Sequence, residues 1–565
     1  MSDSTILRNA VETMQESLPV GDARANAARP NLIENWLHDH LDGVALFVVA
    51  AAFAVRVYVA TRTYLNPDEA LHYLLVNQGS ILQMYRASLT NAHPPLIYFI
   101  VYFWHFLGAS ELMLRMPSVL AGSAFCWVAF KWMRVFASEA ASLMALIFFA
   151  FSPANIALSA EVRAYAVMLL CMAGALYFLA KSLEKNNVTQ MCLFSACLYL
   201  AILSHYSVLF FTVALGIYTL ARIADSRTSR KVILAWAIGQ AGAMGLYGIL
   251  YVTHVSKLKA TIPVWGRMFD AEYFHADSAN IFSFTQVNTL NIFLFLFAHQ
   301  FVAWTLLLSF LGGVVLLIAK DLAHGRRNSD SNSHLGILLL FPFLAVWGAS
   351  LAGIYPYVGS RHTVFLAPFA VAGASYLLAA ISGQRLWASL AIALALMAIS
   401  TNAEKPAEPA ASTDKNPQLM KSAMDYTARA IPPGDRILMD VQSSIQFTYY
   451  FCGPRKIVVL EAFRGIYNHF TCNGDSIVTF NNWRVIAQGF PSQFAKMARE
   501  HDLKPGDRVW YYESGWGESL DTKLDLQDSH FRCLAAQHFG SEIVLIPFVV
   551  GQDFLPTAPA NSCRP

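Results

Sequence analysis

The sequence predicts a polytopic α-helical membrane protein that ends in a separate soluble α/β domain. Of its 565 residues, 56% are hydrophobic and only 14% are charged, and the mean hydropathy is +0.43. Soluble globular chains carry roughly 25% charged residues. Several segments here hold about 20 apolar residues, which is the length that crosses a bilayer. The last part of the chain instead alternates turn signals with short β-rich runs.

Three regions follow from this change in character. Residues 1–40 are polar and mixed in charge, with no apolar stretch before Gly43, which indicates a cytoplasmic tail rather than a cleavable signal peptide. Residues 41–401 form the predicted transmembrane domain. Residues 402–565 form the C-terminal domain, which begins with a Pro- and Ala-rich linker over 402–414.

The C-terminal domain is predicted from its turns and strands. Pro433-Gly434 and Pro505-Gly506 mark turns, and the runs 456–460 and 543–546 have the β-branched composition of strands.

About eleven segments have the length and apolarity of membrane spans. Their predicted ranges are 43–61, 117–136, 140–158, 164–181, 189–204, 206–222, 232–252, 291–319, 335–354, 362–380 and 386–401.

The distribution of Lys and Arg predicts the orientation. Every even-numbered span ends in a basic loop, and cytoplasmic loops are the ones that carry this excess. The residues are Lys131, Arg134, Lys181, Lys185, Arg222, Arg227, Arg230, Lys231, Lys320, Arg326, Arg327 and Arg385. The prediction is a multi-pass protein of the cell inner membrane. Its N-terminus is cytoplasmic and, because the number of spans is odd, its C-terminal domain is periplasmic.

The apolar segment 93–108 is treated separately because it has only 16 residues. Counting it as a span would invert every later loop against the charge pattern. We therefore expect a juxtamembrane or re-entrant helix on the outer face, with a short genuine span as the alternative.

With this topology, the unusual polar residues gather outside. Asp68 and Glu69 stand side by side at a membrane boundary, where such carboxylates are costly unless they pair or act. The other outer boundaries supply His93, Arg115, Glu161, Arg163, His205, Tyr206, Arg361 and His362, and the 253–290 loop supplies Lys257, Lys259 and Arg267. This convergence predicts one acidic–basic site at the lipid surface.

The order of these motifs resembles a known family. The acidic pair is followed by His93-Pro-Pro-Leu96, Leu114-Arg-Met-Pro-Ser118, Glu161-Val-Arg-Ala-Tyr165, Leu203-Ser-His-Tyr206 and Arg361-His-Thr-Val-Phe-Leu-Ala-Pro368. Over about residues 40–380 the chain resembles the GT-C fold glycosyltransferases of the dolichyl-phosphate-mannose protein mannosyltransferase type. This is family 39, whose bacterial relatives include lipid A aminoarabinose and galacturonosyl transferases. The C-terminal domain carries no matching motif.

The resemblance implies an enzyme that moves a sugar from a polyprenyl-phosphate carrier to an acceptor on the periplasmic face. Asp68 matches the family's first-loop acid and is expected to be the base, with inversion at the anomeric carbon. Glu69 is expected to hold the acceptor, orient a cation or bind a metal. The alternative for this pair is a cap on a helix that begins after Pro67, although Asn66 can serve as that cap.

The donor phosphate needs cations and hydrogen-bond donors. Arg163 and Tyr165 match the family's second-loop motif, and Arg163 and Arg361 are the expected phosphate ligands. The alternatives are pairing of Arg163 with Glu161 and snorkelling of Arg361 to headgroups. His93, held extended by the prolines that follow, is a further phosphate candidate or a metal ligand, or simply a hydrogen-bonded histidine.

The remaining residues are expected to support the site. Arg115 is expected to pair with Asp68 or Glu69, while Glu161, His205, Tyr206 and His362 line it. Lys257, Lys259 and Arg267 lie in a loop long enough to close over a head group, or are ordinary solvated side chains. A divalent metal stays open, although the first loop has adjacent acids rather than Asp-x-Asp.

The cysteines divide between the two domains. Cys126, Cys171, Cys192 and Cys197 lie in membrane segments, whereas Cys452, Cys472, Cys533 and Cys563 lie in the C-terminal domain. In an exported domain the latter four predict two disulfides with three possible connectivities, or else free thiols.

Two other classes of function remain as alternatives. A transporter or flippase of a lipid-linked sugar also keeps charges in the membrane region, but typically near the midplane and with internal repeats. A scaffold for the C-terminal domain leaves the outer charges unexplained.

The net charge of +3 gives no support for a nucleic-acid partner. The expected partners are membrane lipids, the lipid-linked donor, and a glycolipid, glycan or protein acceptor. Mannose, galacturonate and aminoarabinose all remain candidates for the sugar.

Overall fold

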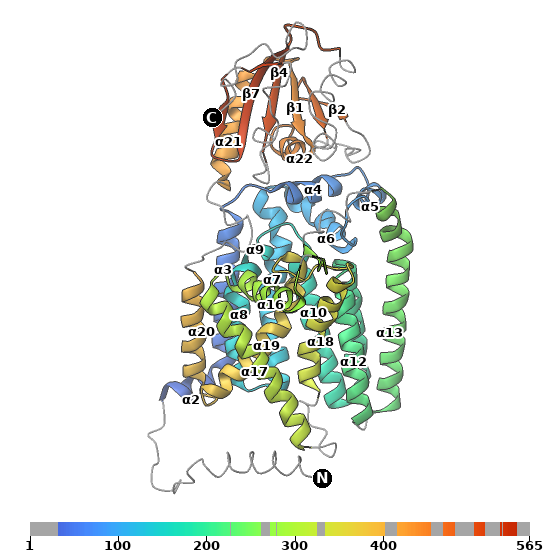
Figure 1. Cartoon of the computed structure of the whole chain (residues 1–565), viewed down its shortest axis with the longest axis vertical. Coiled ribbons are helices and arrows are strands. Elements are labelled where there is room, and N and C mark those ends of the chain that lie inside the picture. Colours follow the sequence, from blue (N-terminus) through green and yellow to red (C-terminus); the bar gives the residue numbers. More distant parts are fainter. Residues whose placement is uncertain are drawn as a thin grey trace.

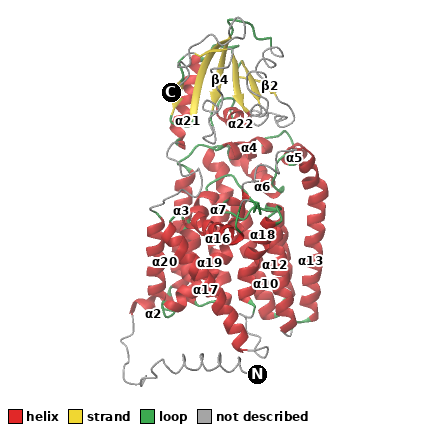
Figure 2. Ribbon diagram, in the orientation of Figure 1, coloured by secondary structure: helices red, strands yellow, loops and turns green. Residues whose placement is uncertain are grey.

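The protein consists of a tall helical body with a small sheet domain at one end (Figures 1 and 2). The computed structural model describes residues 32–225, 228–261, 272–277, 279–324, 334–401, 415–453, 467–480, 502–514, 531–533 and 535–550. The expected loop residue Arg267, the strand run 456–460 and the linker 402–414 lie outside these ranges.

Within the described residues, seven helices are long and apolar enough to cross a membrane, and a bent pair makes an eighth. The seven comprise α3 (Leu41–Ala60), α7 (Glu111–Phe136), α10 (Tyr165–Lys185), α12 (Val208–Asp225), α13 (Arg230–Leu250, continued to Leu258), α17 (Gln300–His324) and α19 (Ala367–Ile381, preceded by the 3-10 turn Arg361–Leu366). The pair is α8 (Glu139–Phe151) and α9 (Pro153–Ser159), bent by 54°, where Pro153 lacks the N–H that a continuous helix needs.

Five shorter apolar helices complete the body. They are α6 with its 3-10 extension (Leu96–Leu107), α11 (Val188–Ser204), α16 (Ile281–Phe297), α18 (Leu335–Leu351) and α20 (Leu386–Ser400). Ten of the eleven predicted spans each correspond to one of these helices or to the bent pair. The eighth, 291–319, was wrong: α16 ends at Phe297, the next residue Ala298 has a positive φ of 56°, and α17 begins at Gln300. Both helices are apolar, so hydropathy alone did not locate the break.

Helix α6 and its extension belong to the segment between α3 and α7, together with α4 (Pro67–Val76) and α5 (Ile81–Ser88). Its 12 residues reach only about 18 Å at 1.5 Å per residue, well short of the roughly 30 Å of a bilayer core. This length fits the expected juxtamembrane or re-entrant helix, and its side of the membrane stays a prediction.

The last residues of the predicted tail are helical. Leu32–Asp39 forms helix α2, which packs on α20. The Glu34 carboxylate accepts hydrogen bonds from the backbone N–H groups of Leu386, at 2.8 Å, and Trp387, at 3.2 Å, and so caps α20. Residues 32–39 are therefore part of the helical body, since they provide a cap that α20 itself lacks.

The basic loops gather at one end of the body, which we call the basic end. Asp42 at the start of α3 pairs with Lys131 at 2.9 Å and Arg134 at 2.7 Å, near the end of α7. His334, just before α18, pairs with Asp225 at the end of α12, at 2.7 Å. The C-terminal domain lies at the opposite end (Figure 1).

The C-terminal domain is a mixed sheet with helices, as predicted. Its elements are α21 (Pro417–Ala430), β1 (Arg436–Asp440), α22 (Val441–Tyr450), β2 (Tyr467–Cys472), β3 (Asp475–Phe480), β4 (Arg508–Glu513), β5 (Phe531–Cys533), β6 (Gln537–Phe539) and β7 (Ile543–Val550). The sheet order is β2-β3-β1-β4-β7-β5, with β6 also on β7. β1 runs parallel to β3 and β4, and the other pairs are antiparallel.

A disulfide joins Cys452, after α22, to Cys472 at the end of β2. This is one of the pairings that the sequence allowed. The side chain of Cys533 and the whole of Cys563 lie outside the described residues, so the second disulfide stays a prediction. α22 follows β1 directly and lies against α4 of the helical body (Figure 1), which brings the two domains into contact at the predicted site.

Candidate functional site

The acidic pair opens helix α4, and its second member is wholly buried. The Asn66 side chain caps the helix by accepting from the Glu69 N–H at 2.9 Å, and the Glu69 carboxylate accepts from the Asn66 N–H at 3.0 Å. This reciprocal arrangement is a capping box, with Pro67 at the first helical position. The expected alternative of a cap therefore holds for Glu69, with Asn66 as its partner.

Glu69 also forms a two-pronged ion pair with Arg115 of α7. The Arg115 Nε and Nη2 atoms donate to the two carboxylate oxygens at 2.7 and 2.6 Å, and the Val162 N–H donates to Oε1 at 2.9 Å. The side chain has no exposed area. Burial by itself raises the pKa of Glu69, but Arg115 outweighs it and the net pKa is lowered. Glu69 contacts protein on all sides, so its geometry is that of a positioning residue rather than a group that meets substrate.

Arg115 uses its remaining N–H groups on the backbone just before α4. Nη1 donates to the carbonyls of Ala60 and Thr63 at 2.6 and 2.7 Å, and Nη2 donates to the carbonyl of Tyr64 at 3.1 Å. The pair of Glu69 and Arg115 thus fixes the turn that leads from α3 into α4. The expectation that Arg115 pairs with one of the two acids is confirmed for Glu69.

Asp68, the neighbouring acid, has a different environment. Its side chain is 29% exposed, and one oxygen, Oδ2, is shared between Arg163 and Arg361, with Arg361 Nη2 at 3.4 Å. Burial opposes its ionisation, but Arg163 and Arg361 outweigh burial and lower the pKa of Asp68. Asp68 is consequently an exposed-edge carboxylate that stays ionised near neutral pH.

Arg163 lies between two carboxylates, and its pairing with Glu161 was the alternative expected from the sequence, whereas its role as a phosphate ligand stays a prediction. It pairs with Asp68, and its Nε lies 3.6 Å from Glu161 Oε2. Burial lowers the pKa of Arg163, but Asp68 and Glu161 more than offset this, so its pKa is raised and its charge is secure. Arg361 begins the 3-10 turn before α19, and Ser360 caps the backbone of that turn. The Arg361 side chain is 22% exposed. One carboxylate therefore serves two guanidinium groups that come from distant parts of the chain.

A group of aromatic rings lies beside this ion cluster. His93 contacts His72 and His205 with ring centroids 5.4 and 5.6 Å apart, and Tyr165 lies 5.3 Å from His205. His72 stacks on Tyr98 at 5.2 Å. Sequence reasoning placed His93, His205 and Tyr165 at the site but missed His72. The available signal was its position four residues after Asp68, one helical turn away.

His72 and His205 are buried, His93 is partly buried, and all three imidazoles are neutral. Burial, with Arg163 nearby, lowers the pKa of His72 to about 4, and burial with Arg361 does the same for His205. Burial and the neighbouring histidines lower the pKa of His93 well below its usual value. His72 Nδ1 contacts the carbonyl of Asp68 at 2.6 Å, whereas its Nε2 is buried with no hydrogen-bond partner. Neutral imidazoles cannot add positive charge for a phosphate, so His93 is better suited to hydrogen bonding than to charge neutralisation.

Tyr206 belongs to a separate chain of hydrogen bonds. Its hydroxyl donates to Nδ1 of His254 at 2.6 Å, and His254 Nε2 donates to the carbonyl of Asn91 at 2.7 Å. His254 lies in a π-helical turn, Tyr251–Val255, at the end of α13. The link joins α13 to the loop that carries His93. His362 adjoins Arg361, and its carbonyl accepts from the Tyr355 hydroxyl at 2.8 Å.

The two loop lysines belong to the helix that continues α13. Lys257 lies in α14 (Ser256–Thr261) and is exposed, while the side chain of Lys259 is outside the described residues. Within those residues no group of three His, Cys, Asp or Glu side chains is arranged to hold a metal ion.

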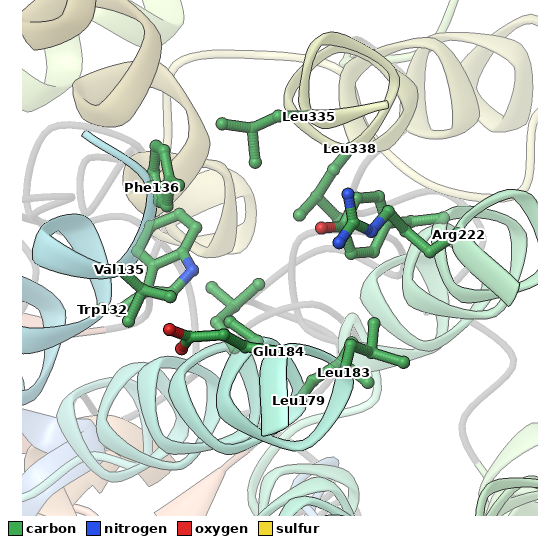
Figure 3. A pocket seen from close by; sticks show the side chains of 12 residues that line it. Trp132, Val135, Phe136, Leu179, Leu183, Glu184, Arg222, Leu335 and Leu338 are labelled. Carbon is green, nitrogen blue, oxygen red and sulfur yellow. The ribbon is translucent and has the colours of Figure 1, made fainter. Parts of the chain in front are cut away.

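A pocket lies at the other end of the body, among the ends of α7, α10 and α12 and the start of α18 (Figure 3). Its lining is mainly apolar, with Glu184 and Arg222 as its charged members, and none of the predicted site residues is part of it. Because Arg222 belongs to the basic end, this pocket is remote from Asp68 and has no place in the candidate site.

Comparison with known proteins bears on both the fold and the site. A sequence profile described as dolichyl-phosphate-mannose-protein mannosyltransferase matches residues 92–248, which is less than half of the chain. This segment includes His93, Arg115, Arg163 and His205. A search of curated proteins finds no match.

Solved structures match over most of the chain. ArnT from Cupriavidus metallidurans bound to undecaprenyl phosphate has a TM-score of 0.53 and 14% identity, and the match covers 89% of this chain and 98% of ArnT. The chain has the GT-C glycosyltransferase fold. Apo ArnT matches with the same TM-score, 13% identity, and 90% and 98% coverage. The archaeal oligosaccharyltransferase AglB from Archaeoglobus fulgidus, in complex with an inhibitory peptide and a dolichol-phosphate, has a TM-score of 0.48, 11% identity, and 93% and 76% coverage. The ArnT matches confirm the predicted fold class, and the profile match confirms the predicted resemblance.

The two acids should respond differently to the same substitution. Glu69→Gln leaves Arg115 buried without its counter-charge, and breaking such a pair costs about 3–5 kcal/mol. Asp68→Asn, at the exposed edge of its cluster, should cost far less. Thermal unfolding of the detergent-solubilised variants measures both. Equal stability of the two variants would contradict the structural role of Glu69.

The buried histidines make stability depend on pH. In the unfolded chain His72 has a pKa near 6.5, but in the folded protein its pKa is about 4. As the pH falls, the unfolded state therefore takes up the proton first. The stability that neutral His72 contributes is complete above pH 6.5 and is lost as the pH falls toward 4.

His72→Gln should accordingly reduce the loss of stability between pH 7.5 and 5.5 by roughly 1 kcal/mol. The measurement is the unfolding temperature in detergent at both pH values. His538→Gln, at an exposed position, is the control and should keep the wild-type slope. If stability depends on pH in His72→Gln as it does in the wild type, then the wild-type His72 imidazole is not held neutral.

Proposed function

We propose that the protein is a glycosyltransferase that moves a sugar from a polyprenyl-phosphate carrier to an acceptor hydroxyl. The observation that carries this proposal is the shared carboxylate oxygen of Asp68, which lies between the guanidinium groups of Arg163 and Arg361. Two guanidinium groups held by one partly exposed carboxylate form a ready site for a phosphate.

The fold and the matched segment support this activity. ArnT, whose structure was solved with undecaprenyl phosphate, shares the fold, and the mannosyltransferase profile covers the segment that includes Arg163 and Tyr165. A polyprenyl-phosphate donor keeps its tail in the bilayer and its phosphate at the boundary, which is where the ion cluster lies if α3, α7 and α10 cross the membrane.

The donor phosphate and Asp68 compete for the same cations. In the free protein, Asp68 is the anion that both Arg163 and Arg361 contact, and its lowered pKa makes it a poor base. A bound phosphate attracts the two guanidinium groups and weakens their hold on Asp68. The pKa of Asp68 then rises toward the range in which a carboxylate accepts a proton effectively.

The transfer step follows from this exchange. The acceptor oxygen attacks the anomeric carbon while the bond from that carbon to the phosphate oxygen breaks. The acceptor proton passes to Asp68, and the bonding electrons leave with the polyprenyl phosphate, whose added charge Arg163 and Arg361 stabilise. A single direct displacement inverts the anomeric configuration. Glu69 holds α4 in place during this step and does not contact substrate.

We place the site on the periplasmic face of a cell inner membrane, with the N-terminus in the cytoplasm. The support is charge: the Lys and Arg residues lie at the basic end, and cytoplasmic loops carry this excess. The ion cluster and the C-terminal domain lie at the opposite end. The GT-C fold and the multi-pass helices are established by the comparison, whereas this orientation is our proposal.

The acceptor is a hydroxyl of lipid A, a core glycan or a protein. The described part of the site contains two carboxylates, Asp68 and Glu161, for the guanidinium groups of Arg163 and Arg361, with neutral histidines beside them. These charges balance, so the described site gives no extra cation for an acidic sugar. Among the candidates, a neutral or amino sugar therefore suits the site better than galacturonate.

The decisive variant is Asp68→Asn. Loss of a general base typically lowers a rate by about 10²–10⁴-fold, so transfer should fall at least 100-fold while the protein still inserts and folds. Mass spectrometry of surface glycolipids and exported proteins, in a deletion strain complemented with each variant, identifies the sugar and the acceptor.

Asp42→Asn is the matched control. Asp42 is also a carboxylate shared by two cations, Lys131 and Arg134, but it lies at the basic end. This variant should transfer sugar like the wild type. Full transfer by Asp68→Asn would eliminate Asp68 as the base. The absence of any sugar-sized mass that depends on the wild-type protein would favour a transporter of the lipid-linked sugar instead.

A further inference from the structure

The C-terminal domain touches the helical body at the residue that precedes the capping box of α4. Leu65 lies immediately before the cap residue Asn66, and both of its backbone hydrogen-bonding groups are bound by side chains of α22. The Leu65 N–H donates to the Tyr450 hydroxyl at 2.7 Å, and the Gln446 amide donates to the Leu65 carbonyl at 2.7 Å. This contact holds a backbone unit from both sides.

The two side chains are themselves fixed. The Tyr450 hydroxyl donates in turn to the carboxylate of Glu111, at the start of α7. Gln446 is fully buried, and its amide oxygen accepts from the Ser514 hydroxyl at 2.8 Å, which sets the orientation of the amide toward Leu65. Ser514 follows β4, and its N–H binds Ser443 Oγ of α22 at 2.9 Å. The hold on Leu65 is thus anchored in the sheet.

The neighbouring residue is held in the same way. The Tyr64 N–H donates to the carbonyl of Lys415 at 2.9 Å, and the Tyr64 hydroxyl donates to the Glu542 carboxylate at 3.0 Å. From the membrane side, Arg115 binds the Tyr64 carbonyl. The backbone before α4 is therefore clamped between Arg115 below and the C-terminal domain above.

We propose that Gln446 and Tyr450 are positioning residues that set the placement of Asp68, so that the C-terminal domain is part of the catalytic apparatus. α4 has only ten residues, and so short a helix depends on tertiary contacts for its position. Asp68 is the second residue of α4 and must reach two guanidinium groups at once. A displacement of about 1 Å at such a group can reduce a rate roughly 100-fold.

The alternative is that the domain merely rests on the body. Tyr449 provides a matched control because it lies on the same helix and binds the other domain equally closely. Its hydroxyl donates to the carbonyl of Ala109 at 2.7 Å, away from Leu65, and its ring contact with Tyr73 survives a change to Phe. Tyr449→Phe therefore removes one interdomain hydrogen bond but none to the start of α4.

The first measurement is hydrogen exchange of the full-length protein in detergent, read on peptides that cover residues 62–76. We expect Tyr450→Phe and Gln446→Met each to speed exchange of this segment at least tenfold, and Tyr449→Phe to leave it unchanged. This readout reports on the position of α4 and does not depend on the reaction. Exchange that is the same in all three variants would overturn the proposal.

The second measurement rests on the proposed function and uses a polyprenyl-phosphate sugar donor with the extracted acceptor. Positioning of the base predicts that Tyr450→Phe and Gln446→Met lower kcat by about tenfold or more, with a smaller change in the donor KM. Tyr449→Phe should retain wild-type kinetics. A wild-type kcat in the first two variants would overturn the catalytic part of the proposal. If the wild type itself transfers no sugar, the proposed function fails, whereas the exchange result still decides whether the domain positions α4.

Discussion

The buried ion pair of Glu69 and Arg115 is the interaction on which the candidate site depends. It joins α4 to α7. The N–H groups of Arg115 that do not bind Glu69 donate to backbone carbonyls and so also fix the segment that leaves α3. Two charges taken out of water need many partners, and here they have them from side chain and backbone alike. The direction in which α4 leaves the helical body, and hence the position of Asp68, follows from this pair.

The adjacent acids illustrate how one helical step separates two roles. Successive residues on a helix point about 100° apart, so when Glu69 faces the interior, Asp68 faces the partly exposed edge where Arg163 and Arg361 converge. The same rotation places His72, one turn later, beneath Asp68. The cluster therefore combines an ionised edge with neutral imidazole rings beneath it, which are buried at His72 and His205. This arrangement supports the proposed transfer site, because a reacting group needs a rigid support.

Much of this architecture could be predicted from the sequence, because hydropathy and loop charge have a direct physical cause in the bilayer. Asp68, Arg163 and Arg361 were predicted to meet, and they do. For Glu69 the sequence left open whether it holds the acceptor, orients a cation, binds a metal or caps a helix, since adjacency in sequence does not reveal which of two acids faces inward. The break at Ala298 was missed because both flanking helices are apolar. The contacts of Gln446 and Tyr450 with Leu65 span more than 380 residues and leave no local pattern to detect.

The central claim is that Asp68 and the donor phosphate compete for Arg163 and Arg361. Binding of polyprenyl phosphate to the purified wild type and to Asp68→Asn, measured by native mass spectrometry in detergent, tests it without any need for the sugar or the acceptor. The account predicts that the variant, which frees both guanidinium groups, binds polyprenyl phosphate more tightly than the wild type. Weaker binding by the variant would contradict it.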